Sequence, residues 1–96
     1  MSIALVVVFT FKEGAEEVAK NALAGLVAAT RQESGCLHFQ AHQSGSSPEQ
    51  WMLYEQWADQ ASIDRHNETA HLAAFKDTVI PLWAAPPDVT TWTPLT

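Results

Sequence analysis

The sequence predicts an α+β fold of the ferredoxin-like kind, in which helices cover one face of an antiparallel sheet. The hydrophobic pattern alternates between strand and helix periods in the order strand, helix, strand, strand, helices, strand, which is the split β-α-β order. The chain has 96 residues, 47% of them hydrophobic, which is enough for one core and too little for two. We therefore predict a single domain over residues 1–96.

The first strand is predicted over Ile3–Lys12, where β-branched and aromatic residues make both faces apolar. A strand of this kind is covered on both sides. The first helix is predicted over Ala15–Glu33, with Gly35 as its C-terminal cap. Apolar residues recur there at helical spacing, and the stripe expected to be buried contains Val18, Ala22, Leu23, Leu26 and Val27.

A β-hairpin is predicted next, from strands at Cys36–Gln43 and Gln50–Trp57 joined by a loop rich in Ser, Gly and Pro. Residues alternate along both strands. In the first strand this places Leu37, Phe39 and Ala41 on one face and His38, Gln40 and His42 on the other.

Two short helices and a closing strand complete the chain. Asp59 is a suitable N-cap for a helix that ends near His66, and Thr69 for the helix that follows. Pro81 is expected to shorten or kink that second helix. After a turn containing two consecutive prolines, Asp88–Thr93 is rich in Thr and Trp and is predicted to be the last strand.

A single copy of this fold leaves one face of its sheet bare. The first strand is apolar on both faces, and Met52, Tyr54 and Trp92 add further bulk opposite or beside the core rows. Bare apolar surface of this kind favours contact with a second subunit. We therefore predict a homodimer that packs sheet against sheet.

The charge pattern argues against several classes of partner. The formal net charge is -6, with only five Lys and Arg residues and no basic cluster, so neither nucleic acid nor an anionic membrane is an expected partner. The apolar start of the chain is too short to span a membrane. Cys36 is the only cysteine, so it forms no internal disulfide, and no Cys/His spacing matches a zinc site. A cytoplasmic location and no bound metal are expected.

The strongest functional signal is a carboxylate in an apolar row. Strand alternation places Glu55 on the same face as Trp51, Leu53 and Trp57, where a purely structural core would have an aliphatic residue. His66 follows at the end of the next helix, on the same helix face as Ile63, and is therefore expected to point inward.

His71 lies five residues beyond His66. On one continuous helix the two rings would diverge by about 140°, so they are not a helical i, i+4 metal pair. The segment Asn67-Glu68-Thr69 is expected to break the helix between them.

Several of these residues together resemble a known family. The pattern contains Glu55-x-Trp57, then His66, then His71 four residues before Phe75, and it is preceded by Ser34-Gly35-Cys36-Leu37-x-Phe39. It resembles the antibiotic biosynthesis monooxygenase family of dimeric α+β barrels, over essentially the whole chain.

The resemblance implies oxygen chemistry without a metal or organic cofactor. A small aromatic substrate, such as a quinol, an anthrone or a related phenol, would be deprotonated, and its anion would react with dioxygen. His66 would be the base or proton shuttle, Glu55 its orienting partner and His71 a further catalytic candidate. Trp57, Phe39 and Phe75 would form the walls of the substrate pocket.

The haem-degrading branch of the family is a poorer match. That branch has an asparagine in the first strand and a ligand histidine in the last long helix. Here Ile3–Phe11 contains no asparagine, and no histidine lies between Leu72 and Trp83.

The same residues fit other interpretations. Glu55 could form an ion pair with Arg65 or with a histidine and simply hold helix to sheet. The protein could be a non-catalytic dimeric module that binds a small apolar ligand. It could also be an isomerase or lyase acting on a small carbonyl compound, because the same base would remove a proton next to a carbonyl group.

Overall fold

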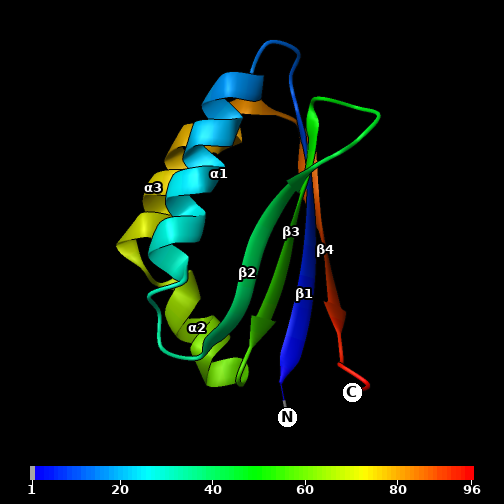
Figure 1. Cartoon of the computed structure of the whole chain (residues 1–96). Helices are drawn as coiled ribbons and strands as arrows, with labels where there is room; N and C mark the ends of the chain where they lie inside the picture. The colour runs from blue at the N-terminus through cyan, green and yellow to red at the C-terminus, as the bar shows by residue number, and fades with distance from the viewer. Residues whose placement is uncertain (1) are drawn as a thin grey trace.

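The computed structural model describes residues 2–96 and has helices on one side of a four-stranded antiparallel sheet (Figure 1). Residue 1 of the predicted domain lies outside the described residues. The sheet order is β2-β3-β1-β4, so the ferredoxin-like α+β prediction is confirmed. The elements are β1 (Ile3–Phe11), α1 (Glu16–Thr30), β2 (Cys36–Gln43), β3 (Gln50–Trp57), α2 (Gln60–Asn67), α3 (Ala70–Val79), the 3-10 turn η1 (Ile80–Leu82) and β4 (Trp83–Trp92).

The β1 strand is central and pairs with both β3 and β4. Its register places Leu5 opposite Glu55, while β2 places Phe39 on the other side of the same glutamate. The side chain of Glu55 therefore rises from the middle of the sheet toward the helices. The core between sheet and helices contains Phe9, Phe11, Leu23, Leu26, Phe39, Leu53, Trp57, Ile63, Phe75 and Val79.

Helix α1 ends earlier than predicted, and its buried stripe is displaced. The helix stops at Thr30 instead of Glu33. Its buried residues are Ala19, Leu23, Leu26 and Thr30. Val18 is 49% exposed, so the expectation that it belongs to the buried stripe was wrong. Several neighbouring apolar positions fit helical spacing, and packing against the sheet selected which of them face inward.

The predicted alternation of β2 fails at its start. Phe39 is buried as expected, whereas Leu37 is 57% exposed. The pairing of β2 with β3 shifts register between Cys36 and His38, and this irregularity turns Leu37 away from the core. From Phe39 onward the predicted faces hold.

The last strand is longer than predicted. Strand β4 begins at Trp83, so the proline pair Pro86-Pro87 lies within a strand and not in a turn. Because β4 is an edge strand and its pairing with β1 is irregular between Val8 and Thr10, prolines are tolerated there. Pro81 acts as predicted, because α3 ends at Val79 and a 3-10 turn follows.

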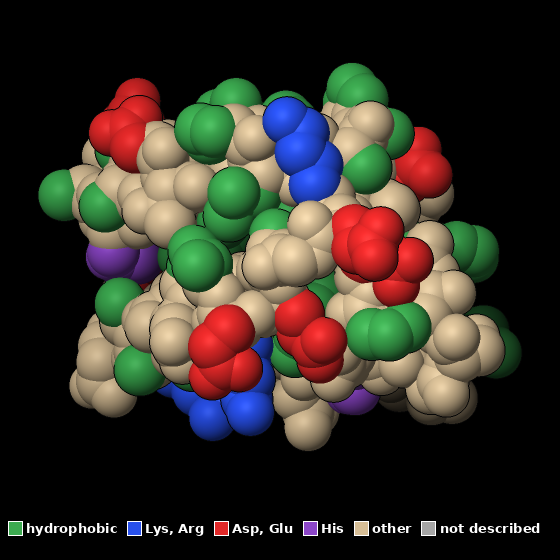
Figure 2. Space-filling view, turned by 90° about the horizontal axis from the view of Figure 1, so that it is seen from above, with side chains coloured by type: hydrophobic (Ala, Val, Ile, Leu, Met, Phe, Trp, Pro, Cys, Tyr) green, Lys and Arg blue, Asp and Glu red, His purple; other side chains and the backbone are tan. Residues whose placement is uncertain are grey.

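The face of the molecule seen in Figure 2 has no continuous basic patch. At the end of the molecule seen in Figure 2, acidic side chains lie scattered among apolar and neutral ones, and the Lys and Arg side chains stand apart. Among residues 2–96, no helix is both long and apolar enough to cross a membrane.

Candidate functional site

A mainly apolar cavity of about 420 Å³ lies between the sheet and helices α2 and α3. Its volume falls in the range of small-molecule sites. Two of the three predicted walls, Phe39 and Phe75, line it, and so do both Glu55 and His66. The other lining residues are Ile3, Leu5, Val7, Phe9, Leu26, Leu53, Gln60, Ile63, Asn67, Leu72, Lys76, Trp83, Pro87, Val89 and Thr91.

Glu55 is buried in the apolar row that the sequence predicted. Only 5% of the residue is exposed, and its Oε1 accepts a hydrogen bond of 2.9 Å from Trp57 Nε1. Burial raises the pKa of Glu55 to about 7, because the charged form loses its hydration; the Trp57 hydrogen bond opposes this shift and the charge of Glu33 adds to it. A carboxyl group with a pKa near neutrality exchanges protons readily at physiological pH.

Helix α2 carries His66 into the same region. Asp59 caps the helix as predicted, accepting hydrogen bonds from the backbone nitrogen and the hydroxyl of Ser62 at 2.9 and 2.7 Å. These bonds lower the pKa of Asp59. Ile63 and His66 are both buried, which confirms that this helix face points inward.

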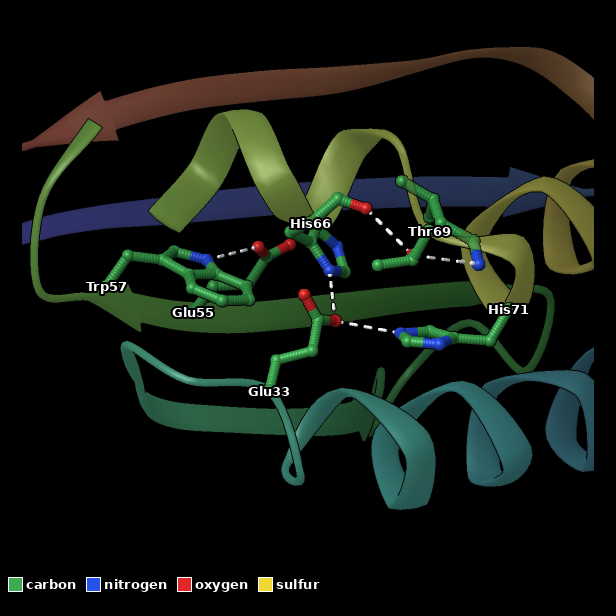
Figure 3. A network of polar contacts seen from close by, with 7 residues as sticks. Glu33, Glu55, Trp57, His66, Thr69 and His71 are labelled. Carbon is green, nitrogen blue, oxygen red and sulfur yellow. Dashed lines mark hydrogen bonds and ion pairs between the residues drawn. The ribbon is translucent and has the colours of Figure 1, made fainter. Parts of the chain in front are cut away.

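A break between α2 and α3 turns the second histidine toward the first. Thr69 caps α3 through a hydrogen bond from Leu72 N, and its hydroxyl donates to the carbonyl of His66 at 2.8 Å. The predicted helix break at Asn67-Glu68-Thr69 is therefore confirmed. His66 lies in the last turn of α2 and His71 in the first turn of α3, so rings that would diverge on one helix meet at a common partner (Figure 3).

That common partner is Glu33, a residue that no sequence pattern marks as functional. Its Oε2 lies 2.7 Å from His66 Nδ1 and 2.8 Å from His71 Nε2. Glu33 immediately precedes the Ser34-Gly35-Cys36 run of the family pattern. Helical spacing predicts Glu33 to be the last residue of the first helix. By itself, an acidic residue at a helix end looks like any solvated glutamate.

The turn that holds Glu33 is docked onto α2. Gly35 has φ +87°, and a Cβ atom there would lie 2.7 Å from the Ser62 Cβ, so only glycine fits. The Gly35 carbonyl also accepts a hydrogen bond of 2.9 Å from Ala58 N. This close approach fixes the position of Glu33 relative to the helix that carries His66.

The structure therefore differs from the prediction that Glu55 is the carboxylate that orients His66. The carboxylate on His66 is Glu33, and the hydrogen bond of Glu55 goes to Trp57 (Figure 3). The alternative ion pair with Arg65 does not form either, because the Arg65 guanidinium donates to the Ser62 hydroxyl. Glu33 is thus bonded to the imidazole from the turn after α1, and Glu55 lines the same cavity as His66.

Trp57 differs from its predicted place as a pocket wall. It is fully buried and lies outside the set of residues that line the cavity. Its ring centroid is 4.7 Å from that of His66, and the Phe39 centroid is 5.8 Å from it. Trp57 thus packs against the imidazole without lining the cavity, whereas Phe39 packs against the imidazole and also lines the cavity.

The contacts of His66 determine its most favourable neutral tautomer. A carboxylate oxygen can only accept a hydrogen bond, so Nδ1 carries the proton that is donated to Glu33. Nε2 is then the nitrogen left with a lone pair. A carboxylate at Nδ1 also stabilises the imidazolium that forms when Nε2 takes up a proton.

Within residues 2–96, one cluster has the side chains to hold a metal ion: a donor atom from each of Glu33, His66 and His71 lies within 4.8 Å of the others. Their geometry is that of a hydrogen-bonded chain. Tetrahedral zinc would hold nitrogen and oxygen donors roughly 3.3 Å apart. The observed separations from Glu33 Oε2 are 2.7 and 2.8 Å, which are typical of charge-assisted hydrogen bonds.

Comparison with known proteins identifies the family. The model of the antibiotic biosynthesis monooxygenase family matches residues 2–78. The chain belongs to this family. The matched region includes Glu33, Glu55, His66 and His71.

Solved structures support the assignment to the antibiotic biosynthesis monooxygenase family. A candidate antibiotic biosynthesis monooxygenase from Nitrosomonas europaea is 26% identical with a TM-score of 0.95, covering 98% of this chain and 90% of its own. A Pseudomonas aeruginosa protein is 28% identical with a TM-score of 0.93, covering 99% and 95%.

A third neighbour, from Bacteroides thetaiotaomicron, is described as a conserved protein of unknown function and candidate oxidoreductase. It is 25% identical with a TM-score of 0.87, covering 95% of each chain. No curated protein is significantly similar to the chain.

Proposed function

We propose that the protein is a cofactor-independent monooxygenase that oxidises a small aromatic compound, such as a quinol, an anthrone or a related phenol, with dioxygen. The observation that carries the proposal is a buried imidazole at the wall of an apolar cavity, with its Nδ1 held by a carboxylate at 2.7 Å. Family membership and the oxidoreductase description of the Bacteroides neighbour favour the same class of reaction.

In the proposed reaction His66 Nε2 removes a proton from the substrate. The resulting carbanion or phenolate gives electrons to dioxygen and forms a carbon–oxygen bond. Return of the proton produces a hydroperoxide, and loss of water from it leaves a carbonyl group. One oxygen atom thus enters the product and the other leaves as water. Apolar walls exclude bulk water while the anion exists.

Glu55 influences the same step through its charge. An ionised carboxylate in the cavity wall would repel a substrate anion, whereas a protonated one can donate a hydrogen bond to the anionic oxygen. Because burial raises the pKa of Glu55 to about 7, its neutral form is well populated at neutral pH. This assigns Glu55 a role beside the substrate oxygen instead of the orienting role expected from the sequence.

Oxygen consumption by the purified, metal-stripped protein tests the proposal directly. With a panel of quinols, anthrones and flavonols, we expect oxygen uptake in the absence of added metal or cofactor. Conversion that proceeds equally well without oxygen would instead identify the isomerase or lyase. Saturable binding with no conversion of any bound compound would identify a binding module.

We also propose that the active form is a homodimer in the cytoplasm. The helices lie on one side of the sheet, so the opposite face is uncovered in a single copy (Figure 1). On that face Val6 and Val8 of β1 pair with Tyr54 and Met52 of β3, and Trp92 of β4 is 57% exposed. Together they form an apolar patch.

Light scattering checks the dimer. The expected native mass is twice the 10.5 kDa of the chain. Met52→Asp places a charge within the proposed interface and is expected to give monomers. Val18→Asp is the matched control, because Val18 is an exposed apolar residue on α1, away from the bare face of the sheet. A monomeric wild-type mass would contradict the proposal.

A further inference from the structure

We propose that His66, Glu33 and His71 form a path for protons between the cavity and solvent, with His71 as its outer end. The inference rests on the proposed function in one respect, since it assigns His66 as the group that accepts the substrate proton. It adds two residues, Glu33 and His71, that do not line the cavity and act through His66.

Exposure to solvent increases in order along the chain. The side chains of His66, Glu33 and His71 are 5%, 13% and 30% exposed. His66 alone of the three lines the cavity, and His71 alone has substantial contact with water. The three groups therefore run outward from the buried cavity wall to the surface and come from three separate elements, α2, the turn after α1, and α3 (Figure 3).

Both contacts use the same oxygen atom. Glu33 Oε2 is the partner of His66 Nδ1 at 2.7 Å and of His71 Nε2 at 2.8 Å. A proton released by one ring therefore reaches the other through a single atom, without a rotation of the carboxyl group. Each ring can be protonated at either nitrogen, so each can take up a proton on one side and release one on the other.

The transfer balances as follows. When His66 Nε2 takes the substrate proton, its Nδ1 proton moves to Glu33 Oε2. Glu33 passes that proton to His71 Nε2 in the tautomer of His71 that carries its own proton on the other nitrogen, Nδ1, and Nδ1 then releases its proton to water. The tautomer with the proton on Nε2, which donates to the ionised Glu33, reaches this state by exchanging protons with water and with Glu33. The substrate anion then remains in the cavity, and the positive charge of the proton has moved to the solvent. Reversal of the same transfers returns a proton through His66 to the peroxide oxygen.

A purely structural role makes a different prediction. If Glu33 only clamps the two helices, any donor at position 71 that keeps the hydrogen bond should serve. His71→Gln separates the two roles, because the side-chain amide nitrogen of Gln lies at about the position of Nε2 and can donate to Glu33, yet it cannot relay a proton. His71→Ala removes both the bond and the relay.

The first test measures exchange of the His66 Nδ1 proton with water by NMR, at low temperature and without substrate. In His71→Gln we expect this exchange to slow by at least about tenfold relative to wild type. In His71→Ala, added imidazole should restore exchange in proportion to its concentration. An unchanged rate in His71→Gln, or no response of His71→Ala to imidazole, would overturn the path.

This outcome is independent of the proposed reaction, because no substrate is present. If no substrate is turned over, a slowed exchange of the His66 Nδ1 proton in His71→Gln would still support the proton path. Conversely, turnover without slowed exchange would leave the monooxygenase proposal and reject the path. Where turnover is found, His71→Gln should lower kcat with KM unchanged and increase the solvent deuterium isotope effect, a signature that a clamp alone would not produce.

Discussion

Replacement of His66 by Asn is expected to lower kcat for oxygen consumption by about 10²- to 10⁴-fold, which is the usual contribution of a general base. Asn is chosen because its side-chain nitrogen takes about the position of Nδ1 and can still donate to Glu33, which lies 2.7 Å from Nδ1 in the native protein. The variant therefore keeps the hydrogen bond and loses only the proton acceptor at Nε2. Steady-state oxygen uptake measures the effect.

Two further measurements separate chemistry from folding. The His66→Asn variant loses ring contacts with Trp57 and Phe39, at a cost of about 1 to 3 kcal/mol, and should remain folded by circular dichroism. Binding of a non-reactive substrate analogue should change little, because the lost group acts on the transition state. If kcat in this variant stays within about threefold of wild type, His66 is not the base.

Replacement of Glu55 by Gln is expected to stabilise the protein at pH 8 while impairing turnover. The folded-state pKa of about 7 exceeds the ordinary value of 4.5, so ionisation of Glu55 opposes folding. A pKa difference of about 2.5 corresponds to about 3 kcal/mol at most. The buried amide of Gln loses part of this gain, so we expect about 1 to 3 kcal/mol.

The pH dependence has a definite sign. Between about pH 4.5 and 7 the folded state binds more protons at Glu55 than the unfolded state does, so the wild-type free energy of unfolding falls as pH rises. The advantage of Glu55→Gln should therefore be small near pH 4.5, grow up to about pH 7 and stay constant above it. Urea unfolding at several pH values and one protein concentration measures this.

Glu49→Gln is the matched control for the stability prediction. Glu49 is an exposed residue in the loop before β3, so the same substitution there should change stability by less than about 0.5 kcal/mol at every pH. If Glu55→Gln is instead less stable than wild type at pH 8, the ionised carboxylate makes a favourable interaction. The proposed role of neutral Glu55 beside the substrate oxygen would then fail.

Sequence patterns predicted the fold because its signals are local. The two-sided apolar strand at Ile3–Phe11, the caps Asp59 and Thr69, and the stop at Pro81 each act within a few residues of chain. The two errors in the strands have a common cause. The exposure of Leu37 and the early start of β4 both depend on irregular pairing with a neighbouring strand, which residue spacing along one strand does not encode.

By itself the sequence determined that Glu55 stands in an apolar row and that His66 faces inward, because strand and helix periods fix the direction of side chains within one element. Only the tertiary structure decided which carboxylate serves His66. Glu33 is 33 residues from His66 and 38 from His71, and it reaches both because the Gly35 turn docks on α2 and Thr69 breaks the helix between the histidines. Contacts between distant segments depend on how elements pack, and packing has no period in the sequence.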